Sequence, residues 1–318
     1  MHLKGLDLNL LVVLDTLLAE KNITRTGERI NLSQSATSGA LARLREFFGD
    51  PLLVQIGQRM ELTPLAEKLA QPVREIILKG ESLVDKNQGF RPETSTRTFR
   101  LNMSDYAAAV ILTGVLGRLR ELAPQARLEI SSIIDEPTID YLDRGYLDLI
   151  ICPTEHTSPL HPSETLFDDK FVAVVWSGNQ NVQHEMTLEN YLSLGHIVAR
   201  FGKIPGWAFD EVFIARSGYQ RRIDVVASSF SMLINQVIGT QMVATIHERF
   251  AQYYAQYLPI KIFPVPIPIP PFKMKMQWHR FHDSDAGIQW LRQVLRKGAE
   301  GLRPLACSAG SRKGGAGR

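Results

Sequence analysis

Residues 23–49, ITRTGERINLSQSATSGALARLREFFG, constrain the fold of this 318-residue chain more than any other stretch. Asn31 and Leu32 separate two helical patterns, and Thr24 and Ser33 are of the residue types that cap the start of a helix. This order predicts a short helix, a tight turn and a second helix of about four turns. Such a pair packs as one small helical unit.

The second predicted helix has one apolar and one polar face. The first face can pack on the preceding helices and consists of Thr37, Ala40, Leu41, Leu44 and Phe48. The opposite face has small or hydrogen-bonding side chains: Gln34, Ser35, Ser38, Ala42 and Arg45. A helix with such a face can lie in the major groove of DNA and read base edges. The alternative is an ordinary helical hairpin with a polar outer face. In either case Gly27 falls where the two helices must approach closely.

Two short strand patterns follow this helical pair. They cover Leu52–Gln55 and Met60–Thr63, with Gly57 at the tip of the turn that joins them. Two helices and a two-stranded hairpin form a winged helix-turn-helix, whose wing contacts phosphates or a minor groove. Gln58 and Arg59 are the donors that such a wing would offer. The alternative is that the hairpin only seals the small domain.

The charge of the chain does not by itself point to DNA. The formal net charge is +3, and the first 65 residues contain seven basic and seven acidic side chains. Basic residues instead accumulate at the C-terminus, where residues 299–318 are rich in Gly, Ser and Arg and are expected to be disordered. The prediction of DNA binding therefore rests on the geometry of the helix and the wing.

Residues 64–86 form one long helical pattern. Thr63 can cap it and Pro64 suits its first position. Its apolar residues follow coiled-coil spacing: Leu69, Val73, Ile76, Gly80 and Leu83. A seam exposed between two domains needs a partner, so we expect a dimer; the alternative is that the helix packs on its own chain. The polar stretch 87–97 completes the linker.

Residues 98–298 alternate strand and helix patterns, which predicts an α/β domain with parallel strands. After Pro153 a second set of strands and helices begins, and the chain returns through residues 260–278 to a closing helix. Two lobes with a late return to the first are the plan of periplasmic-binding-protein-like domains. These domains hold a ligand in the cleft between their lobes.

Ligands in such domains bind where strand ends and helix N-termini face the cleft. The first lobe offers Ser104, Asp105, Tyr106, Cys152 and Pro153 at these places, and the second offers Phe201, Gly202, Lys203 and His247. This mixture of aromatic, polar and charged groups suits an aromatic, phenolic or weakly anionic effector. The alternatives are that Ser104 only caps a helix and that His247 is structural.

Two stretches carry a family resemblance: LDLNLLVVLDTLLAEKNITRTGERINLSQSATSGALARLREFFGDPLLV and LTPLAE. They resemble the N-terminal domain of the LysR-type regulators almost without gaps. FRLNMSDY, GYLDLIICP, LFDDKFVAVV, LSLGHIVARFG and IPIPPFKMKMQWH are similar to the branch of nodulation regulators and regulators of aromatic-compound degradation. The resemblance covers nearly everything except the tail. The chain departs from it at Gly27, where many members have alanine, and at Gly39 and Gln55, where many have arginine.

The resemblance implies a cytoplasmic transcription regulator without a cofactor that binds double-stranded promoter DNA and answers to a small effector. It implies DNA contacts from the wing and from Gln34, Ser35, Thr37 and Ser38. The linker helix would pair with its copy, two dimers would join as a tetramer, and RNA polymerase would be a further partner. We expect four parts: the DNA-binding domain 1–63, the linker 64–97, the effector-binding domain 98–298 and the tail 299–318.

Two other classes of protein fit less well. Ser104, Asp105 and His247 would make a nucleophile set of an enzyme, but GxSxG, HExxH and GxxxxGK[ST] motifs are all missing. A transport-type solute receptor would leave the helix-turn-helix unexplained and lacks a signal peptide. The two cysteines, 152 and 307, are far apart in the sequence and indicate no structural zinc, and no run of about 20 apolar residues indicates a membrane span.

Overall fold

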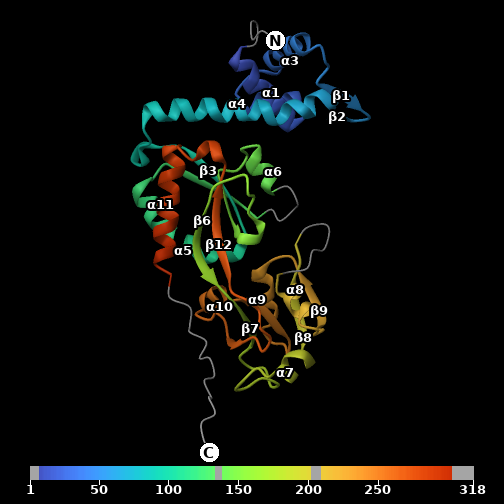
Figure 1. Cartoon of the computed structure of the whole chain (residues 1–318), viewed down its shortest axis with the longest axis vertical. Helices are drawn as coiled ribbons and strands as arrows, with labels where there is room; N and C mark the ends of the chain where they lie inside the picture. The colour runs from blue at the N-terminus through green and yellow to red at the C-terminus, as the bar shows by residue number, and fades with distance from the viewer. Residues whose placement is uncertain (1–6, 133–137, 202–208, 303–318) are drawn as a thin grey trace, which may run out of the picture. The chain divides into compact units, whose positions relative to one another are not determined.

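The computed structural model describes residues 7–132, 138–201 and 209–302, with the side chains of 81–88 and 209 excepted. The chain divides into two units (Figure 1). The first is built around residues 7–90 and takes in Asp143–Tyr146 and Phe281–Ala286. The second contains the remaining described residues. No helix among the described residues is long and apolar enough to cross a membrane.

The first unit consists of four helices and a hairpin among its described residues. They are α1 (Leu8–Glu20), α2 (Ile23–Arg29), α3 (Gln34–Phe48), β1 (Leu53–Ile56), β2 (Arg59–Leu62) and α4 (Pro64–Gln88). The side chain of Ser33 caps α3 and that of Thr63 caps α4, as the sequence predicts. The predicted cap of α2 is wrong, because Thr24 lies inside that helix. Asn22 is extended instead, and its side chain accepts the Arg25 amide hydrogen at 3.0 Å.

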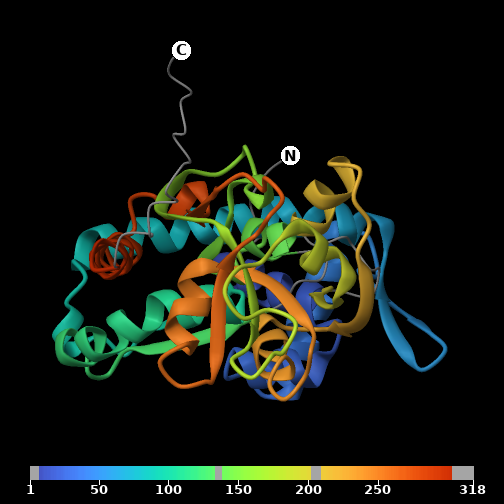
Figure 2. The ribbon, with the colours of Figure 1, turned by 90° about the horizontal axis from the view of Figure 1, so that it is seen from below.

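The core of the first unit lies between α1, α3 and the start of α4. Leu14 of α1 and Leu44 of α3 are fully buried there, and Val73 of α4 packs into the same cluster. The hairpin β1–β2 is antiparallel and extends away from the helices of its unit (Figure 2). Its tip is Gly57, whose φ of 62° lies in the left-handed region that glycine favours.

The second unit has two lobes, each built on a five-stranded sheet. The sheet of the first lobe has the order β4-β3-β5-β12-β6: β4 (Arg127–Ser131), β3 (Thr98–Met103), β5 (Leu149–Pro153), β12 (Phe272–Trp278) and β6 (Ser163–Asp169). Strands β4, β3 and β5 are parallel, and β12 runs antiparallel to both of its neighbours. The helices of this lobe are α5 (Asp105–Leu122), α6 (Thr138–Asp143) and α11 (Ala286–Glu300).

The sheet of the second lobe has the order β11-β7-β10-β8-β9. Its strands are β11 (Ile260–Pro264), β7 (Phe171–Trp176), β10 (Val243–His247), β8 (Gly195–Ala199) and β9 (Arg222–Ala227). Strands β10, β8 and β9 are parallel, and β7 is antiparallel to β10 and β11. Its helices are α7 (Leu188–Ser193), α8 (Phe209–Arg216), α9 (Phe230–Gln236) and α10 (Glu248–Tyr254).

The chain crosses between the lobes twice. The first crossing joins β6 to β7 at Lys170, and the second joins β11 to β12. Strand β12 therefore returns to the sheet of the first lobe, as the sequence predicts, and α11 follows it. The predicted α/β architecture, with a winged helix-turn-helix, a long helix and two lobes, is confirmed.

Candidate DNA-binding surface and effector site

Helix α3 presents one continuous exposed face. Gln34, Ser35, Ser38 and Ala42 are exposed, whereas Ala40, Leu41 and Leu44 on the other side are buried. The Ser33 side chain accepts the Ala36 amide hydrogen and also contacts the hydroxyl of Ser35 at 3.0 Å. The exposed side chains are short, so a DNA backbone or base edge can come close to the helix axis.

Thr37 does not belong to this face. Its side chain is fully buried, and its hydroxyl donates to the carbonyl oxygen of Ser33 at 3.0 Å. The predicted contact between Thr37 and DNA is therefore corrected to a packing role. The resemblance that suggested the contact gives a position in the motif and does not give the direction of the side chain.

The predicted close approach at Gly27 is confirmed. A Cβ atom there would lie 2.7 Å from the carbonyl oxygen of Leu32 and 3.0 Å from the hydroxyl oxygen of Thr37. The Leu32 amide also donates to the carbonyl oxygen of Gly27 at 2.8 Å. The missing side chain thus allows the turn to close on α2 and sets the position of α3.

Arg45 holds the segment that leads into the wing. Its Nε donates to the carbonyl oxygen of Pro51 at 2.8 Å, and its Nη2 donates to that of Leu53 at 3.1 Å. Arg45 is also exposed, so its predicted DNA contact stays a prediction beside this positioning role. These two bonds fix the angle between α3 and the hairpin β1–β2.

The wing presents polar and apolar groups at its tip. Gln58 and Arg59 are exposed, as a phosphate or groove contact requires, and Ile56 beside them is 63% exposed. The Gln55 side chain donates to the carbonyl oxygen of Gly57 at 3.2 Å and stiffens the turn. The geometry is compatible with the predicted contacts of Gln58 and Arg59.

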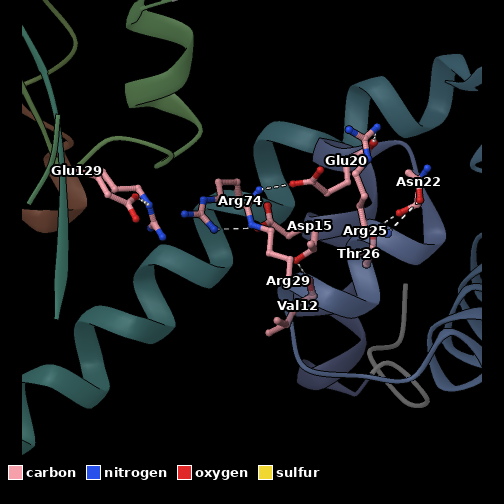
Figure 3. Close-up of polar contacts among 11 residues, drawn as sticks. Val12, Asp15, Glu20, Asn22, Arg25, Thr26, Arg29, Arg74 and Glu129 are labelled. Carbon is pink, nitrogen blue, oxygen red and sulfur yellow. Dashed lines mark hydrogen bonds and ion pairs between the residues drawn. The ribbon is translucent and has the colours of Figure 1, made fainter. Parts of the chain in front are cut away.

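Several basic side chains of the first unit are engaged by acidic partners. Lys21 pairs with Glu61 at 2.7 Å, Arg29 with Glu20, and Arg74 of α4 with Asp15 of α1 at 2.8 Å. Figure 3 shows the Arg29 and Arg74 contacts, together with Asn22 at the start of α2. These pairs neutralise positive charge at the surface of the unit and connect its elements to one another.

Arg43 is a candidate contact that the sequence reasoning missed. It is exposed on α3 beside the polar face, whereas only Arg45 had been assigned to that face. The helical spacing places residue 43 one turn after Gly39, so its long side chain can reach a phosphate. The sequence shows this spacing. It does not show that two donors of Arg45 are used within the chain, which makes Arg43 the freer of the two arginines.

The predicted dimer seam of α4 is divided in the structure. Leu69 and Val73 pack on the core of their own unit, and the side chain of Val73 is only 3% exposed. Ile76, in contrast, is 46% exposed. The side chain of Leu83 lies outside the described residues. Val73 is therefore corrected to a core position, whereas the predicted seam contact of the half-buried Leu69 stays a prediction.

The first turn of α5 lies where the two lobes meet. Ser104 caps α5 by accepting the Ala107 amide hydrogen at 3.2 Å, and the side chain of Asp105 contacts the start of α9 in the second lobe. The ring of Tyr106 stacks on that of His247, with centroids 3.7 Å apart. The structure thus brings together four of the predicted effector residues, all of them already in contact with the protein itself.

Two aromatic rings extend this junction. The rings of Phe201 and Phe230 lie 4.9 Å apart, and Phe230 also contacts the rings of Tyr106 and His247. Both phenylalanines are half-buried. Phe230 is a residue that the sequence reasoning missed, because nothing local in the sequence shows that α9 starts opposite α5. Gly202 and Lys203 lie outside the described residues.

Cys152 and Pro153 are the last two residues of β5. Cys152 packs against the small cluster of Leu142, Leu147 and Ile150, and burial raises the pKa of its thiol to about 12. Pro153 is paired with Met274 in the sheet. The predicted role of both residues in the effector site stays a prediction.

Burial determines the ionisation of the groups at the junction. It lowers the pKa of His247 to about 3, so this imidazole is neutral near pH 7. It raises the pKa of Asp169 to about 6, against the opposing effect of the hydrogen bond from Tyr106. Among the described residues, no group of three or more His, Cys, Asp and Glu side chains is arranged to hold a metal ion.

Comparisons with known proteins agree with this architecture. Residues 8–67 match the family "Bacterial regulatory helix-turn-helix protein, lysR family", and residues 92–300 match the "LysR substrate binding domain". The chain is 38% identical to nodulation protein D of Bradyrhizobium sp. (strain ANU 289) over 95% of this chain and 89% of that protein.

Solved structures show the same fold. A probable transcriptional regulator of Pseudomonas aeruginosa, PA0477, has a TM-score of 0.67 and 27% identity, covering 93% of this chain and 98% of its own. CbnR, solved in complex with its target DNA, has a TM-score of 0.59 and 12% identity, covering 92% and 100%. The family is one of regulators and not of enzymes, in agreement with the sequence prediction. The chain is a member of the LysR family of transcription regulators, with a helix-turn-helix DNA-binding domain and an effector-binding domain.

Proposed function

We propose that this regulator binds a pseudo-palindromic promoter site as a dimer, with the exposed face of α3 in the major groove. The observation that carries the proposal is the division of α3 into a buried side and an exposed side. The exposed side chains of Gln34, Ser35 and Ser38 can donate to or accept from base edges. Gln58 and Arg59 of the wing would contact the neighbouring phosphates or minor groove.

Selection of binding sites from random duplex DNA by the full-length protein tests this proposal. We expect the recovered sites to contain two inverted half-sites, because a two-fold dimer presents two copies of α3. Recovery of no common sequence, or of a single unrepeated half-site, would contradict it.

We further propose that the effector is an aromatic or phenolic compound bound between the lobes of the second unit. The half-buried rings of Phe201 and Phe230 support this choice, because flat apolar rings favour a flat apolar ligand. Ser104 at the start of α5 supplies a polar group nearby, and Asp105 disfavours a strongly anionic ligand.

A thermal-shift panel tests the class of effector. Phenols and aromatic acids are compared with aliphatic acids of similar size and charge. A ligand that binds the folded protein raises its Tm in proportion to the logarithm of its concentration above Kd. We expect aromatic members alone to raise Tm; a rise with aliphatic acids alone would contradict the proposed class.

We propose a homodimer that assembles into a homotetramer. Since Val73 is used internally, the dimer surface would be the part of the same α4 stripe that stays exposed, at Ile76, together with the exposed Leu8 and Val12 of α1. In the second unit, apolar side chains are exposed on one edge strand of each sheet: Ile130 of β4, and Ile223 and Val226 of β9. Edge strands with exposed apolar groups are suited to pairing with another copy.

Each part of the chain would then have its own role in regulation. Residues 1–63 would bind promoter DNA, residues 64–97 would hold the dimer together, and residues 98–298 would bind the effector. As a regulator of transcription, the tetramer would act on RNA polymerase at the promoter.

A further inference from the structure

Asp105 connects the first turn of α5 to the second lobe. Its Oδ2 accepts the amide hydrogen of Ser231 at 2.7 Å, and its Oδ1 accepts that of Phe230 at 3.3 Å. Both amides belong to the first turn of α9, whose own cap is the side chain of Ser229. A carboxylate of the first lobe thus satisfies backbone donors that are 125 and 126 residues away along the chain.

Tyr106, the next residue, is fixed to the crossing between the lobes. Its hydroxyl donates to Oδ2 of Asp169 at 2.7 Å, and its ring stacks on His247 with an interplanar angle of 6°. Asp169 is the last residue of β6, and its other oxygen accepts the amide hydrogens of Lys170 and Arg249 at 2.8 and 3.4 Å. One helical turn therefore makes two different connections to the second lobe.

The two connections differ in how easily they can open. Tyr106 and Asp169 are 2% and 0% exposed, and the Tyr106 ring also packs edge-on against four phenylalanines: Phe167, Phe230, Phe250 and Phe272. Separating Tyr106 would uncover these rings and leave a buried carboxylate without its donor. Asp105 is only half-buried, so water can replace the α9 amides as its partners, and Ser229 still caps α9.

We propose that Asp105 is a latch that holds the two lobes together without effector, and that Tyr106, Asp169 and His247 form the pivot about which they open. The latch rests on the proposed function, since it opposes the separation of the lobes that entry of a ligand beside Phe201 and Phe230 requires. Release of Asp105 shifts the balance between closed and open lobes while the pivot keeps its contacts.

Hydrogen–deuterium exchange of the full-length, effector-free protein tests the latch. In Asp105→Ala we expect the amides of Phe230 and Ser231 to exchange about tenfold faster or more, because they lose a charged acceptor. Asp105→Asn, which keeps one acceptor oxygen, should lie between this variant and the parent. Asp140→Ala is the matched control, since Asp140 is an exposed aspartate in the first turn of α6. Unchanged exchange at α9 in Asp105→Ala would overturn the latch.

A distance between the lobes gives the second readout. Spin labels are placed at the exposed positions Arg118 of α5 and Glu189 of α7, after both native cysteines have been replaced by serine. We expect Asp105→Ala to lengthen or broaden the distance distribution and Asp140→Ala to leave it unchanged. Identical distributions in all three proteins would show that Asp105 does not restrain the lobes.

Tyr106→Phe separates the latch from the pivot. This variant keeps the stacked ring but loses the bond to Asp169, so we expect a lower Tm with parental exchange at Phe230 and Ser231. Faster exchange at these amides in Tyr106→Phe would contradict the division of roles. All measurements are made without effector, so a failed latch leaves the aromatic-effector proposal standing, and a negative ligand panel leaves the latch standing.

Discussion

The carbonyl oxygen of Leu32 lies 2.7 Å from the position that a Cβ atom would take on Gly27. Nonbonded carbon and oxygen atoms do not approach so closely, and this oxygen belongs to the backbone of the turn between α2 and α3. A side chain at position 27 would therefore push the turn, and with it the start of α3, away from its present place.

Gly27→Ala should lower the free energy of unfolding of the DNA-binding unit by about 1–3 kcal/mol. Gly39→Ala is the matched control, because nothing lies within 4 Å of a Cβ atom there and alanine favours the helix. Urea unfolding of both variants checks this. Equal or greater stability of Gly27→Ala would show that the turn adapts without strain.

Acid should destabilise the effector-binding unit between about pH 6.5 and 4. The unfolded chain binds a proton at His247 near its ordinary pKa of 6.5, whereas the folded chain does so only near a pKa of about 3. His196, with its pKa lowered to about 4, acts in the same direction. Asp169 acts in the opposite direction, because its folded pKa of about 6 lies above the ordinary 3.8.

Two variants separate these contributions. His247→Phe should make the loss of stability on acidification shallower, since the group that binds protons only on unfolding is gone. Asp169→Asn should make it steeper, because a group that binds protons in the folded state is removed. Urea unfolding at intervals from pH 4.5 to pH 7.5 measures how steeply the free energy of unfolding depends on pH in each variant. This pH range follows from the pKa values above. Parallel curves for the three proteins would contradict the assigned ionisation states.

Ile76→Asp should break the dimer without unfolding its chain, because the charge would be desolvated at an interface but lies in water in the monomer. Ile76→Val is the control, since it keeps an apolar surface. Sedimentation velocity should show smaller species for the aspartate variant alone. An oligomer unchanged by Ile76→Asp would place the dimer contact elsewhere.

Phe201→Ala should raise the effector concentration needed for half-maximal response about tenfold or more, through loss of an aromatic contact. Tyr257→Ala is the control, because this aromatic side chain is 69% exposed in the same unit. Calorimetry with the ligand found in the panel measures both. A parental affinity in Phe201→Ala would remove this residue from the effector site.

The helices of the first unit could be predicted from the sequence because their signals are local. Ser33 and Thr63 cap helices from positions directly before them, and Pro64 suits the first helical turn. Val73 was assigned to a dimer seam because a coiled-coil stripe and a core-facing stripe have nearly the same period. Which of the two kinds of stripe Val73 belongs to depends on where α1 lies, and the sequence pattern does not give that position.

Strand β6, Ser163–Asp169, could not be predicted from the sequence pattern. Its sequence SETLFDD alternates charged and apolar residues too weakly to be recognised, and it is an edge strand paired only with β12. The contacts of Asp105 with α9 could not be predicted either. They join positions more than a hundred residues apart, and a periodic pattern predicts local structure but not such long-range contacts.

The most direct test of the account is the ratio of operator to random-DNA affinity in Gln34→Ala, measured by titration at fixed salt. Gln34 is exposed at the start of α3, so its loss should weaken operator binding by about 1–3 kcal/mol and leave random-DNA binding nearly unchanged. Arg59→Ala should weaken binding to both kinds of DNA alike, since a phosphate contact carries no sequence information. A parental ratio in Gln34→Ala would contradict the claim that α3 reads the promoter.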